Sequence, residues 1–382
     1  MIKDFVGFGA LSEALEALAS DGYKRIFVVA SPGAWGRFTG KGEWPFFHDR
    51  TVEVFGRFSP NPDFREILAG MERFNAFKPD LIMAIGGGSP IDVAKMIRVM
   101  AYTVPPYDPE SPEKIVPAGE GPPLVAVATT AGSGAEATRF AVFYVGERKQ
   151  SMAHDSLRPE VAVVDPELTY SMPPKLTAEC GFDALSQAVE SYWAVGATDE
   201  SREIAAAAMG YILPNLYNAV HEPQAKNRYN MAIGAYQAGR AINITRTTVP
   251  HALGYHLTKK YGLSHGHSVA LTLPFFLVIN SDPNAKVTAP GGADAHCAMM
   301  RALLSLLGQE TALDAAMFWR NLLRTCGLTP TLRGAGLTTD TQLRALIASV
   351  NPARLGNNPV AVDVGLLLAI FRNEPEVDHD DE

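Results

Sequence analysis

Four of the nine histidines in this 382-residue chain fall within one short segment, "TTVPHALGYHLTKKYGLSHGHSV", at residues 247–269. They are His251, His256, His265 and His267. Imidazole nitrogens bind divalent metals and exchange protons near neutral pH. The segment is therefore either a metal site with a proton relay beside it or a group of histidines that only pack and face solvent.

A carboxylate and a carboxamide lie in a second segment that could complete such a site. Asp183 and Gln187 in "GFDALSQAVES" are four residues apart and share one face of a predicted helix. His256 follows His251 by five residues, which turns it roughly 140° away on a helix. His265 comes after a glycine-containing turn and can return towards His251. An Asp oxygen with these two histidines suits Fe²⁺ or Zn²⁺.

Two small-residue loops indicate phosphate binding. "AIGGGSPIDVAK" at residues 84–95 reads as a strand, a glycine turn and a helix. We expect Ser89 to be the N-cap, Pro90 the first helical residue and Asp92 part of the first turn. Such a helix N-terminus binds pyrophosphate, although the loop alone is also compatible with a plain turn. A second loop, "TTAGSG" at residues 129–134, offers the hydroxyl groups of Thr129, Thr130 and Ser133.

The hydrophobic pattern predicts two domains. Up to about residue 170, buried-strand segments such as "RIFVVAS", "DLIMAIGGG" and "EVAVVDPEL" alternate with helical ones such as "LSEALEALASDG". This alternation predicts an α/β domain with a parallel sheet at residues 1–170. Helical patterns dominate afterwards, which predicts an all-α domain at 171–375 and an acidic tail at 376–382. Prolines cluster at the boundary, near 166–174, and "AKVTAPGGADA" is predicted to be a loop.

Composition limits the classes of partner. The chain is 47% hydrophobic and 19% charged, and its formal net charge of -8 argues against nucleic acid as a ligand. Its three cysteines lie far apart and fit a reducing cytoplasm better than a disulfide framework. We find no signal-peptide or membrane-spanning pattern. We therefore expect a soluble cytoplasmic protein with neither a nucleic-acid nor a membrane partner.

Taken together, these segments resemble the iron-containing, or group III, alcohol dehydrogenase family. The likeness rests on "GGGSPIDVAK", "TTAGSGAEAT", "DPELTYSMPPKLTAECGFDAL" and "VPHALGYHL…LSHGHSVAL". It implies an N-terminal dinucleotide-binding domain, an all-helical metal-binding domain and a cleft between them, which is the architecture of dehydroquinate synthase. It also implies NAD(P)H as a cofactor and a homodimer.

The resemblance assigns roles to particular residues. The nucleotide contacts that it implies are Gly86, Gly87, Gly88, Ser89, Asp92, Thr129, Thr130, Ser133, Thr138 and Lys149. The metal ligands that it implies are Asp183, His251 and His265, with Gln187 at a position where the family usually has histidine. Because of this glutamine, both Fe²⁺ and Zn²⁺ remain open.

Two further positions differ from the usual family pattern. Tyr255 stands where many members have a histidine beside the metal, so Tyr255 and His267 are both candidates for the proton relay. Ser31 stands where NAD-preferring members often have an aspartate that repels a 2′-phosphate. Both NAD and NADP therefore remain open.

The substrate prediction rests on the phosphonoacetaldehyde reductase branch of the family. "ATRFAVFYV", the glutamine at position 187 and "AINITRTTVPHALGY" resemble that branch. Reduction of phosphonoacetaldehyde to 2-hydroxyethylphosphonate would need cations for the anion, and arginine offers a planar fork. The candidates are Arg246, Arg240 and Arg139. The alternatives are a short-chain alcohol or lactaldehyde reductase, a dehydroquinate synthase-like lyase and a non-catalytic nucleotide-binding protein.

Overall fold

A computed structural model describes residues 3–42, 44–146, 148–350 and 352–374, and the chain divides into two compact units. The first unit runs to Met172 and takes in Arg228–Gly239. The second comprises Pro173–Asn227 and the chain from Arg240 onward. The predicted acidic tail at 376–382 lies outside the described residues. Within the described ranges, no helix has the length and apolar composition needed to cross a membrane.

A six-stranded parallel sheet forms the centre of the first unit, in the order β1-β8-β5-β4-β2-β3. Its strands are β1 (Lys3–Val6), β2 (Arg25–Val29), β3 (Thr51–Phe55), β4 (Leu81–Gly86), β5 (Leu124–Ala128) and β8 (Val161–Val164). Every residue of β4, β5 and β8 is buried, as the apolar runs in the sequence require. The predicted parallel sheet is thus confirmed. A separate antiparallel pair, β6 (Phe140–Val145) and β7 (Arg148–Ala153), was not predicted.

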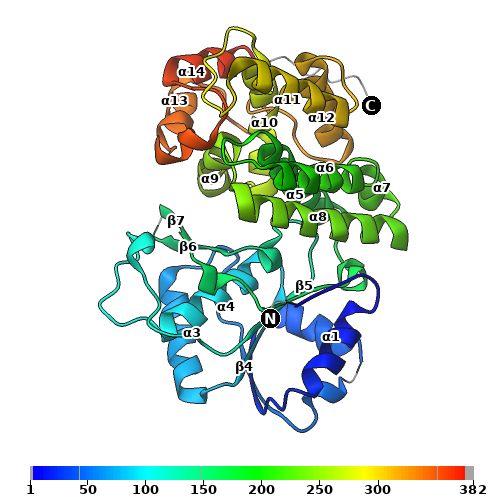
Figure 1. Ribbon diagram of the computed structural model, residues 1–382, viewed down its shortest axis with the longest axis vertical. Helices are drawn as coiled ribbons and strands as arrows, with labels where there is room; N and C mark the ends of the chain where they lie inside the picture. The colour runs from blue at the N-terminus through cyan, green and yellow to red at the C-terminus, as the bar shows by residue number, and fades with distance from the viewer. Residues whose placement is uncertain (1–2, 43, 147, 351, 375–382) are drawn as a thin grey trace. The chain divides into compact units, whose positions relative to one another are not determined.

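Helices cover both faces of this sheet (Figure 1). They are α1 (Ala10–Ala19), α2 (Pro32–Gly40), α3 (Phe64–Phe77) and α4 (Gly88–Ala101). Successive side chains of β2 point to opposite faces. Ile26 and Val28 pack in the core that includes α1 and α2, whereas Phe27 and Val29 pack with α3 and α4. Both faces of the central strands are therefore apolar and buried.

The strand order reverses between β2 and β4. From β2 the chain continues to the edge strand β3 on one side, and from β4 it continues to β5 on the other. Open α/β sheets bind ligands beyond the carboxyl ends of the strands at such a switch point. Ser31 follows β2 and the loop Gly86–Ser89 follows β4, so the topology puts both predicted nucleotide segments at this position.

Helices make up the second unit, which confirms the predicted all-helical region. They are α5 (Pro174–Trp193), α6 (Asp199–Ile212), α7 (Leu216–His221), α8 (Ala225–Thr245, of which 228–239 belong to the first unit), α9 (Val249–Tyr261), α10 (His265–Ser281), α11 (Gly292–Leu306), α12 (Ala312–Thr325), α13 (Asp340–Ala348) and α14 (Val364–Arg372). Short 3₁₀ helices are η1 (Pro45–Phe47), η2 (Pro112–Lys114), η3 (Ala135–Ala137), η4 (Asp155–Leu157), η5 (Pro166–Thr169) and η6 (Pro352–Asn357).

The helix α5 lies at the centre of the second unit and contacts α6, α7, α10 and α11. Phe182 and Trp193 on this helix are fully buried, and the Phe182 ring packs 5.7 Å from that of Trp319 on α12. The predicted loop at 285–295 is partly wrong, because α11 already begins at Gly292 after the left-handed Gly291. Long apolar faces on α5, α9 and α10 hold these three helices together, and they carry the predicted metal ligands.

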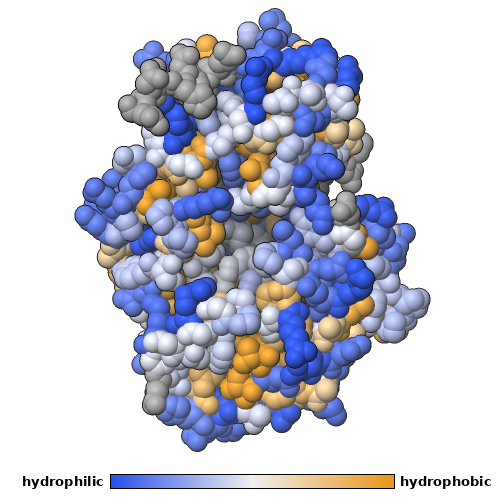
Figure 2. All heavy atoms as spheres, turned by 180° about the vertical axis from the view of Figure 1, so that it is seen from behind, coloured by the Kyte–Doolittle hydropathy of each residue, from blue (hydrophilic) through white to orange (hydrophobic). Residues whose placement is uncertain are grey.

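Hydrophobic residues on the surface lie in separate groups. On the face shown in Figure 2, hydrophilic residues predominate and hydrophobic ones form several groups between them. The most exposed large hydrophobic side chains include Val104, Leu313 and Met317. Exposed hydrophobic residues are common on protein surfaces, and their exposure alone assigns no function.

Candidate functional site

Three predicted metal ligands come together from three helices of the second unit. Asp183 lies on α5, His251 on α9 and His265 at the start of α10. Gly262 ends α9 in a left-handed conformation, which lets the chain turn back as expected. One ligand atom from each of the three side chains lies within 4.8 Å of the others.

The geometry of these side chains fits a divalent ion. His251 Nε2 is 3.5 Å from Asp183 Oδ1, close to the ~3.4 Å edge of a tetrahedron built on metal–ligand bonds of about 2.1 Å. The rings of His251 and His265 lie 5.3 Å apart at an angle of 73°. His251 Nε2 is buried and makes no hydrogen bond among the described residues. A buried polar atom of this kind is costly without a partner, and an ion at this point would supply one.

Gln187 and His256 occupy different positions relative to this group. Gln187 is buried one turn after Asp183 on the same face of α5, and its Oε1 atom is shielded from solvent. With Gln187, the donor set contains two oxygens and two nitrogens. An amide oxygen is a harder donor than an imidazole nitrogen. His256 lies outside the group, with its ring 6.1 Å from that of Tyr261. Burial and, secondarily, Lys260 lower the pKa of His256.

Glu190 is a residue that the sequence analysis missed. It is fully buried on α5, and its carboxylate accepts a hydrogen bond from His251 Nδ1. Burial by itself would lower the pKa of His251, but the negative charges of Glu190 and Asp183, together with the hydrogen bond to Glu190, outweigh it and raise that pKa to about 9. A spacing signal was available, because Asp183, Gln187 and Glu190 follow the i, i+4, i+7 pattern of one helical face.

The two candidates for the proton relay differ in their surroundings. The Tyr255 ring stacks on that of His265, with centroids 5.7 Å apart and planes 21° apart. His267 is buried, and its Nε2 atom lies 2.8 Å from the backbone oxygen of Thr329. Burial lowers the pKa of His267 more than this hydrogen bond raises it. The structure therefore brings Tyr255 to a predicted metal ligand, whereas His267 anchors α10 to the segment around Thr329.

The glycine loop differs in one detail from the prediction. Helix α4 begins at Gly88 with Gly87 as its N-cap, so Ser89 is not the N-cap residue. The Ser89 hydroxyl instead donates to the backbone oxygen of Pro60. The backbone angle that favours glycine is at Gly86, with φ 150°, and the helix begins two residues later, at Gly88. Pro90 consequently occupies the third helical position, still within the turn whose N–H groups lack helical partners.

The two small-residue loops lie side by side at the ends of β4 and β5. The Thr129 N–H donates to the Gly86 oxygen at 2.9 Å. A Cβ added to Gly87 would lie 2.9 Å from Thr130 Oγ1, and one on Gly88 would lie 2.8 Å from Ser133 Oγ. A side chain at either glycine would therefore force the side chain of Thr130 or Ser133 to move, which shows how closely the two loops approach each other.

A buried lysine supports the second loop from behind. Lys95 is fully buried and donates to the backbone oxygens of Ala135, Thr138 and Phe140 at 2.7–2.8 Å. Burial lowers the pKa of Lys95 to about 8. Thr138 also accepts from Lys95 through its hydroxyl, at 3.2 Å. Thr138 is thus buried against this lysine.

Asp92 and Lys149 lie next to this support. The carboxylate of Asp92 accepts from the backbone N–H of Val142 in β6 at 3.1 Å. Burial raises the pKa of Asp92 to about 6, although the charges of Lys95 and Lys149 act in the opposite direction. Lys149, half-buried on β7, therefore lies within electrostatic reach of Asp92.

The remaining predicted residues are distributed over both units. Ser31 is the N-cap of α2, and its hydroxyl accepts from the Ala34 N–H at 3.2 Å. Arg139 forms an ion pair with Asp155 at 2.8 Å. Arg240 is half-buried on α8. Arg246 is exposed at the end of α8, with φ 61° and ψ 176°.

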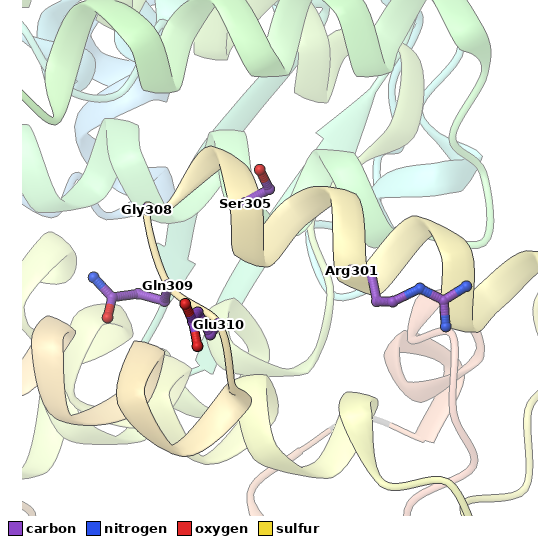
Figure 3. Close-up of a pocket in the computed structure, with 5 residues that line it drawn as sticks. All are labelled: Arg301, Ser305, Gly308, Gln309 and Glu310. Atoms are coloured by element: carbon purple, nitrogen blue, oxygen red, sulfur yellow. The ribbon is translucent and has the colours of Figure 1, made fainter.

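A surface depression in the second unit is lined by none of these residues (Figure 3). Its volume is about 460 Å³, and it is lined by Arg301, Ser305, Gly308, Gln309 and Glu310 around the end of α11. These side chains are exposed or half-buried, and none of them was predicted to take part in the chemistry. The metal group, with its converging buried donors, is the stronger candidate for a reaction site.

Comparison with models of known protein families identifies the family of this chain. The sequence matches the family model "Iron-containing alcohol dehydrogenase" over residues 3–166. It matches the model "Fe-containing alcohol dehydrogenase family, C-terminal" over residues 177–374. The chain belongs to the iron-containing alcohol dehydrogenase family. It is therefore an oxidoreductase, as the sequence motifs predicted.

Individual relatives of this alcohol dehydrogenase cover most of the chain. Long-chain-alcohol dehydrogenase 1 of Geobacillus thermodenitrificans is 33% identical over 71% of this chain and 70% of its own length. Phosphonoacetaldehyde reductase of Streptomyces viridochromogenes is 32% identical over 80% of each chain. The crystal structure of sulfoacetaldehyde reductase from Bifidobacterium kashiwanohense in complex with NAD⁺ has a TM-score of 0.85 and 29% identity, covering 97% of this chain and 96% of that one.

Proposed function

We propose that this alcohol dehydrogenase reduces a two-carbon aldehyde that carries an anionic group, most specifically phosphonoacetaldehyde to 2-hydroxyethylphosphonate. The reaction would use NAD(P)H and a divalent metal, Fe²⁺ or Zn²⁺. Asp183, Gln187, His251 and His265 would hold the metal, and the loops at 86–89 and 129–133 would bind the dinucleotide.

The names of two relatives support an aldehyde substrate that carries an anionic group. By their names, one reduces phosphonoacetaldehyde and the other sulfoacetaldehyde. Both substrates are short aldehydes with a negative group at the far end, so a site for either needs a cation. At 32% and 29% identity the relatives leave the choice between phosphonate and sulfonate to experiment.

The substrate proposal rests on the backbone conformation of Arg246. Its φ and ψ values lie in a region that is essentially restricted to glycine and that costs about 1–3 kcal/mol for other residues. Asn357 fixes the segment by donating to the backbone oxygens of Thr245 and Thr247 at 2.9 and 3.0 Å. Non-glycine residues in such strained conformations cluster at functional sites, and Arg246 lies five residues before His251.

The protein side chains would bind, orient and protonate the substrate. When bound, the metal would supply Lewis-acid polarisation of the carbonyl group, and the nicotinamide would supply the hydride. Tyr255, stacked on His265, would donate the proton that the product alcohol requires. We favour Tyr255 over His267 because the Nε2 atom of His267 is engaged with Thr329. Arg246 would hold the anionic end of the substrate by charge-assisted hydrogen bonds.

Replacing Arg246 tests the substrate proposal. Arg246→Ala should lower kcat/KM for phosphonoacetaldehyde by roughly ten- to a hundredfold, because a hydrogen bond to a charged group contributes about 1.5–3 kcal/mol. The same variant should leave propanal reduction nearly unchanged. Steady-state kinetics with both aldehydes, and with sulfoacetaldehyde as a third, measures this selectivity.

Three control variants separate the guanidinium from the backbone and from other arginines. Arg246→Gly removes the charge and relieves the unfavourable φ, so a selective loss in this variant cannot come from strain. Arg139→Ala should have a small effect, since Arg139 is already paired with Asp155, and Arg240→Ala tests the remaining candidate arginine. A wild-type enzyme without preference for the charged aldehydes, or equal losses on all substrates, would leave only the general alcohol dehydrogenase assignment.

We also propose that the enzyme is a cytoplasmic homodimer, which the family resemblance supports. Sedimentation of the purified protein should give twice the mass of one chain. A monomer at micromolar concentration would contradict this part of the proposal.

A further inference from the structure

A single carboxylate links two parts of the candidate metal site. The side chain of Glu190 is completely buried on α5. One of its oxygens bonds to His251 Nδ1, and the other accepts from the Thr248 N–H at 2.6 Å and the Thr248 hydroxyl at 2.8 Å. A buried carboxylate is costly unless all its acceptor positions are used, and these bonds use both oxygens.

The bond to His251 determines which nitrogen of the ring can bind a metal. An ionised carboxylate only accepts hydrogen bonds, so the Nδ1 atom facing Glu190 must carry a proton. The lone pair of the neutral ring is then on Nε2, which points to Asp183 at 3.5 Å. We propose that Glu190 is the positioning residue that sets the tautomer and the orientation of His251 for metal binding. This inference rests on the metal site of the proposed function.

The bonds to Thr248 fix the backbone on which His251 is carried. Thr248 is the N-cap of α9, yet its side chain does not cap that helix. Its hydroxyl instead donates to Glu190 and accepts from the Trp193 indole N–H at 3.0 Å. Both partners lie on α5, so the same helix that carries Asp183 also determines where α9 begins. Glu190 therefore orients the His251 ring directly and positions its helix through Thr248.

The variant Glu190→Gln tests the tautomer directly. Its amide oxygen can still accept from Thr248, but its NH₂ group would then face His251 Nδ1. The ring would have to accept there and carry its proton on Nε2, which blocks the metal-binding nitrogen. Zn²⁺ affinity, measured by competition with a chelator, should fall by about ten- to a hundredfold, the usual effect of removing such an outer hydrogen bond.

Two variants are matched controls for packing and for the turn. Ser191→Ala removes a neighbouring buried hydroxyl, which bonds to Thr245 and not to His251, and should leave Zn²⁺ affinity unchanged. Thr248→Val removes the hydroxyl bonds to Glu190 and Trp193 but keeps the bond from His251 to Glu190, so Zn²⁺ affinity should fall less than in Glu190→Gln. Wild-type affinity in Glu190→Gln, or a loss no greater than in Thr248→Val, would overturn the inference.

A measurement on the wild-type protein remains decisive even if Glu190→Gln does not fold. Labelling histidine with ¹⁵N and recording ring spectra of the Zn²⁺-loaded protein identifies the protonated nitrogen of His251, assigned by its loss in His251→Ala. Protonation at Nδ1 is expected, and protonation at Nε2 would refute the role of Glu190. His265→Ala tests the metal site separately from Glu190. If this variant binds Zn²⁺ as tightly as wild type, the proposed metal site is wrong.

Discussion

The hydroxyl of Ser31 caps α2 at the point where β2 ends, beside the switch point of the sheet. Ser31→Asp should shift the preference towards NADH, because a carboxylate there would repel the 2′-phosphate of NADPH. Aspartate is an equally good N-cap, so stability should change little. The ratio of kcat/KM for NADH and NADPH measures the shift, and Ser31→Ala is the uncharged control. An unchanged ratio would mean that the adenosine ribose binds elsewhere.

Glu136 gives a prediction about pH. Burial raises the pKa of this carboxyl group from its ordinary value of 4.5 to about 7, although a backbone hydrogen bond and Lys95 act in the opposite direction. Between these two values the folded protein binds more protons than the unfolded chain, so its stability falls as pH rises from 4.5 to 7. Glu136→Gln removes this loss. The variant should gain about 1–3 kcal/mol over wild type at pH 8 and little at pH 4.

Unfolding by urea at several pH values checks the prediction for Glu136. Only the difference between variant and wild type matters, because other groups titrate in both proteins. Glu120→Gln, at an exposed position, is the control for the substitution of glutamate by glutamine itself. A constant difference for Glu136→Gln would contradict the proposed ionisation cost.

At the level of single residues, the types and spacing of side chains predicted which residues come together better than they predicted hydrogen bonds. Asp183, His251 and His265 could be grouped from helix periodicity and a turn, and the structure brings them together. Glu190 was missed because its role depends on bonds to residues about 60 positions away in the chain. Ser89 was misplaced as an N-cap because sequence preference cannot tell which of several adjacent small residues begins the helix.

The packing of α10 against α5 positions the metal ligands at the level of elements. Gly266 follows His265 directly, and a Cβ on it would lie 2.0 Å from the Glu179 backbone oxygen and 2.8 Å from Asp183 Cβ. Backbone cannot move aside as a flexible side chain can. Gly266→Ala should therefore push the start of α10 away from α5, with a cost of about 1–3 kcal/mol in stability and a tenfold or greater loss of Zn²⁺ affinity.

Gly210 provides a matched control for this prediction. It lies on α6, and a Cβ there would meet nothing within 4 Å. Gly210→Ala should be neutral or stabilise the helix by up to about 1 kcal/mol, with unchanged Zn²⁺ binding. Urea unfolding and chelator competition on both variants separate the two effects. Equal behaviour of the two alanine variants would show that the contact between α10 and α5 does not hold His265 in place.

Element prediction succeeded where burial was complete. The runs that became β4 and β5 are apolar throughout, which is typical of strands covered on both faces. The hairpin β6–β7 was missed because its burial is uneven, and β7, "RKQSMA", has a single buried residue. Such a strand is stabilised by its pairing partner, and the sequence of one strand alone does not reveal that partner.

At the scale of the whole molecule, the predicted dinucleotide residues lie in the first unit and the predicted metal ligands in the second. The sequence predicted an α/β region followed by a helical one, because buried parallel strands appear as short apolar runs whereas amphipathic helices repeat about every 3.6 residues. It could not establish the substrate, since recognition of an anion depends on where a few arginine side chains reach. A mutation in one unit should therefore abolish binding of one ligand, NAD(P)H or Zn²⁺, and leave binding of the other ligand intact.

Two variants and one control variant test this division by thermal unfolding. Saturating Zn²⁺ and saturating NAD(P)H should each stabilise the wild type, by about 2.7 kcal/mol at a hundredfold excess over Kd. Gly88→Val should lose the response to NAD(P)H and keep that to Zn²⁺, because a side chain there meets Ser133 Oγ at 2.8 Å and blocks the approach of the pyrophosphate. His265→Ala should lose only the Zn²⁺ response, and His256→Ala should keep both, since its ring lies outside the ligand group. If Gly88→Val and His265→Ala each lost both responses, the two sites would not be separable in this way, and dinucleotide and metal binding would have to be treated as one coupled event.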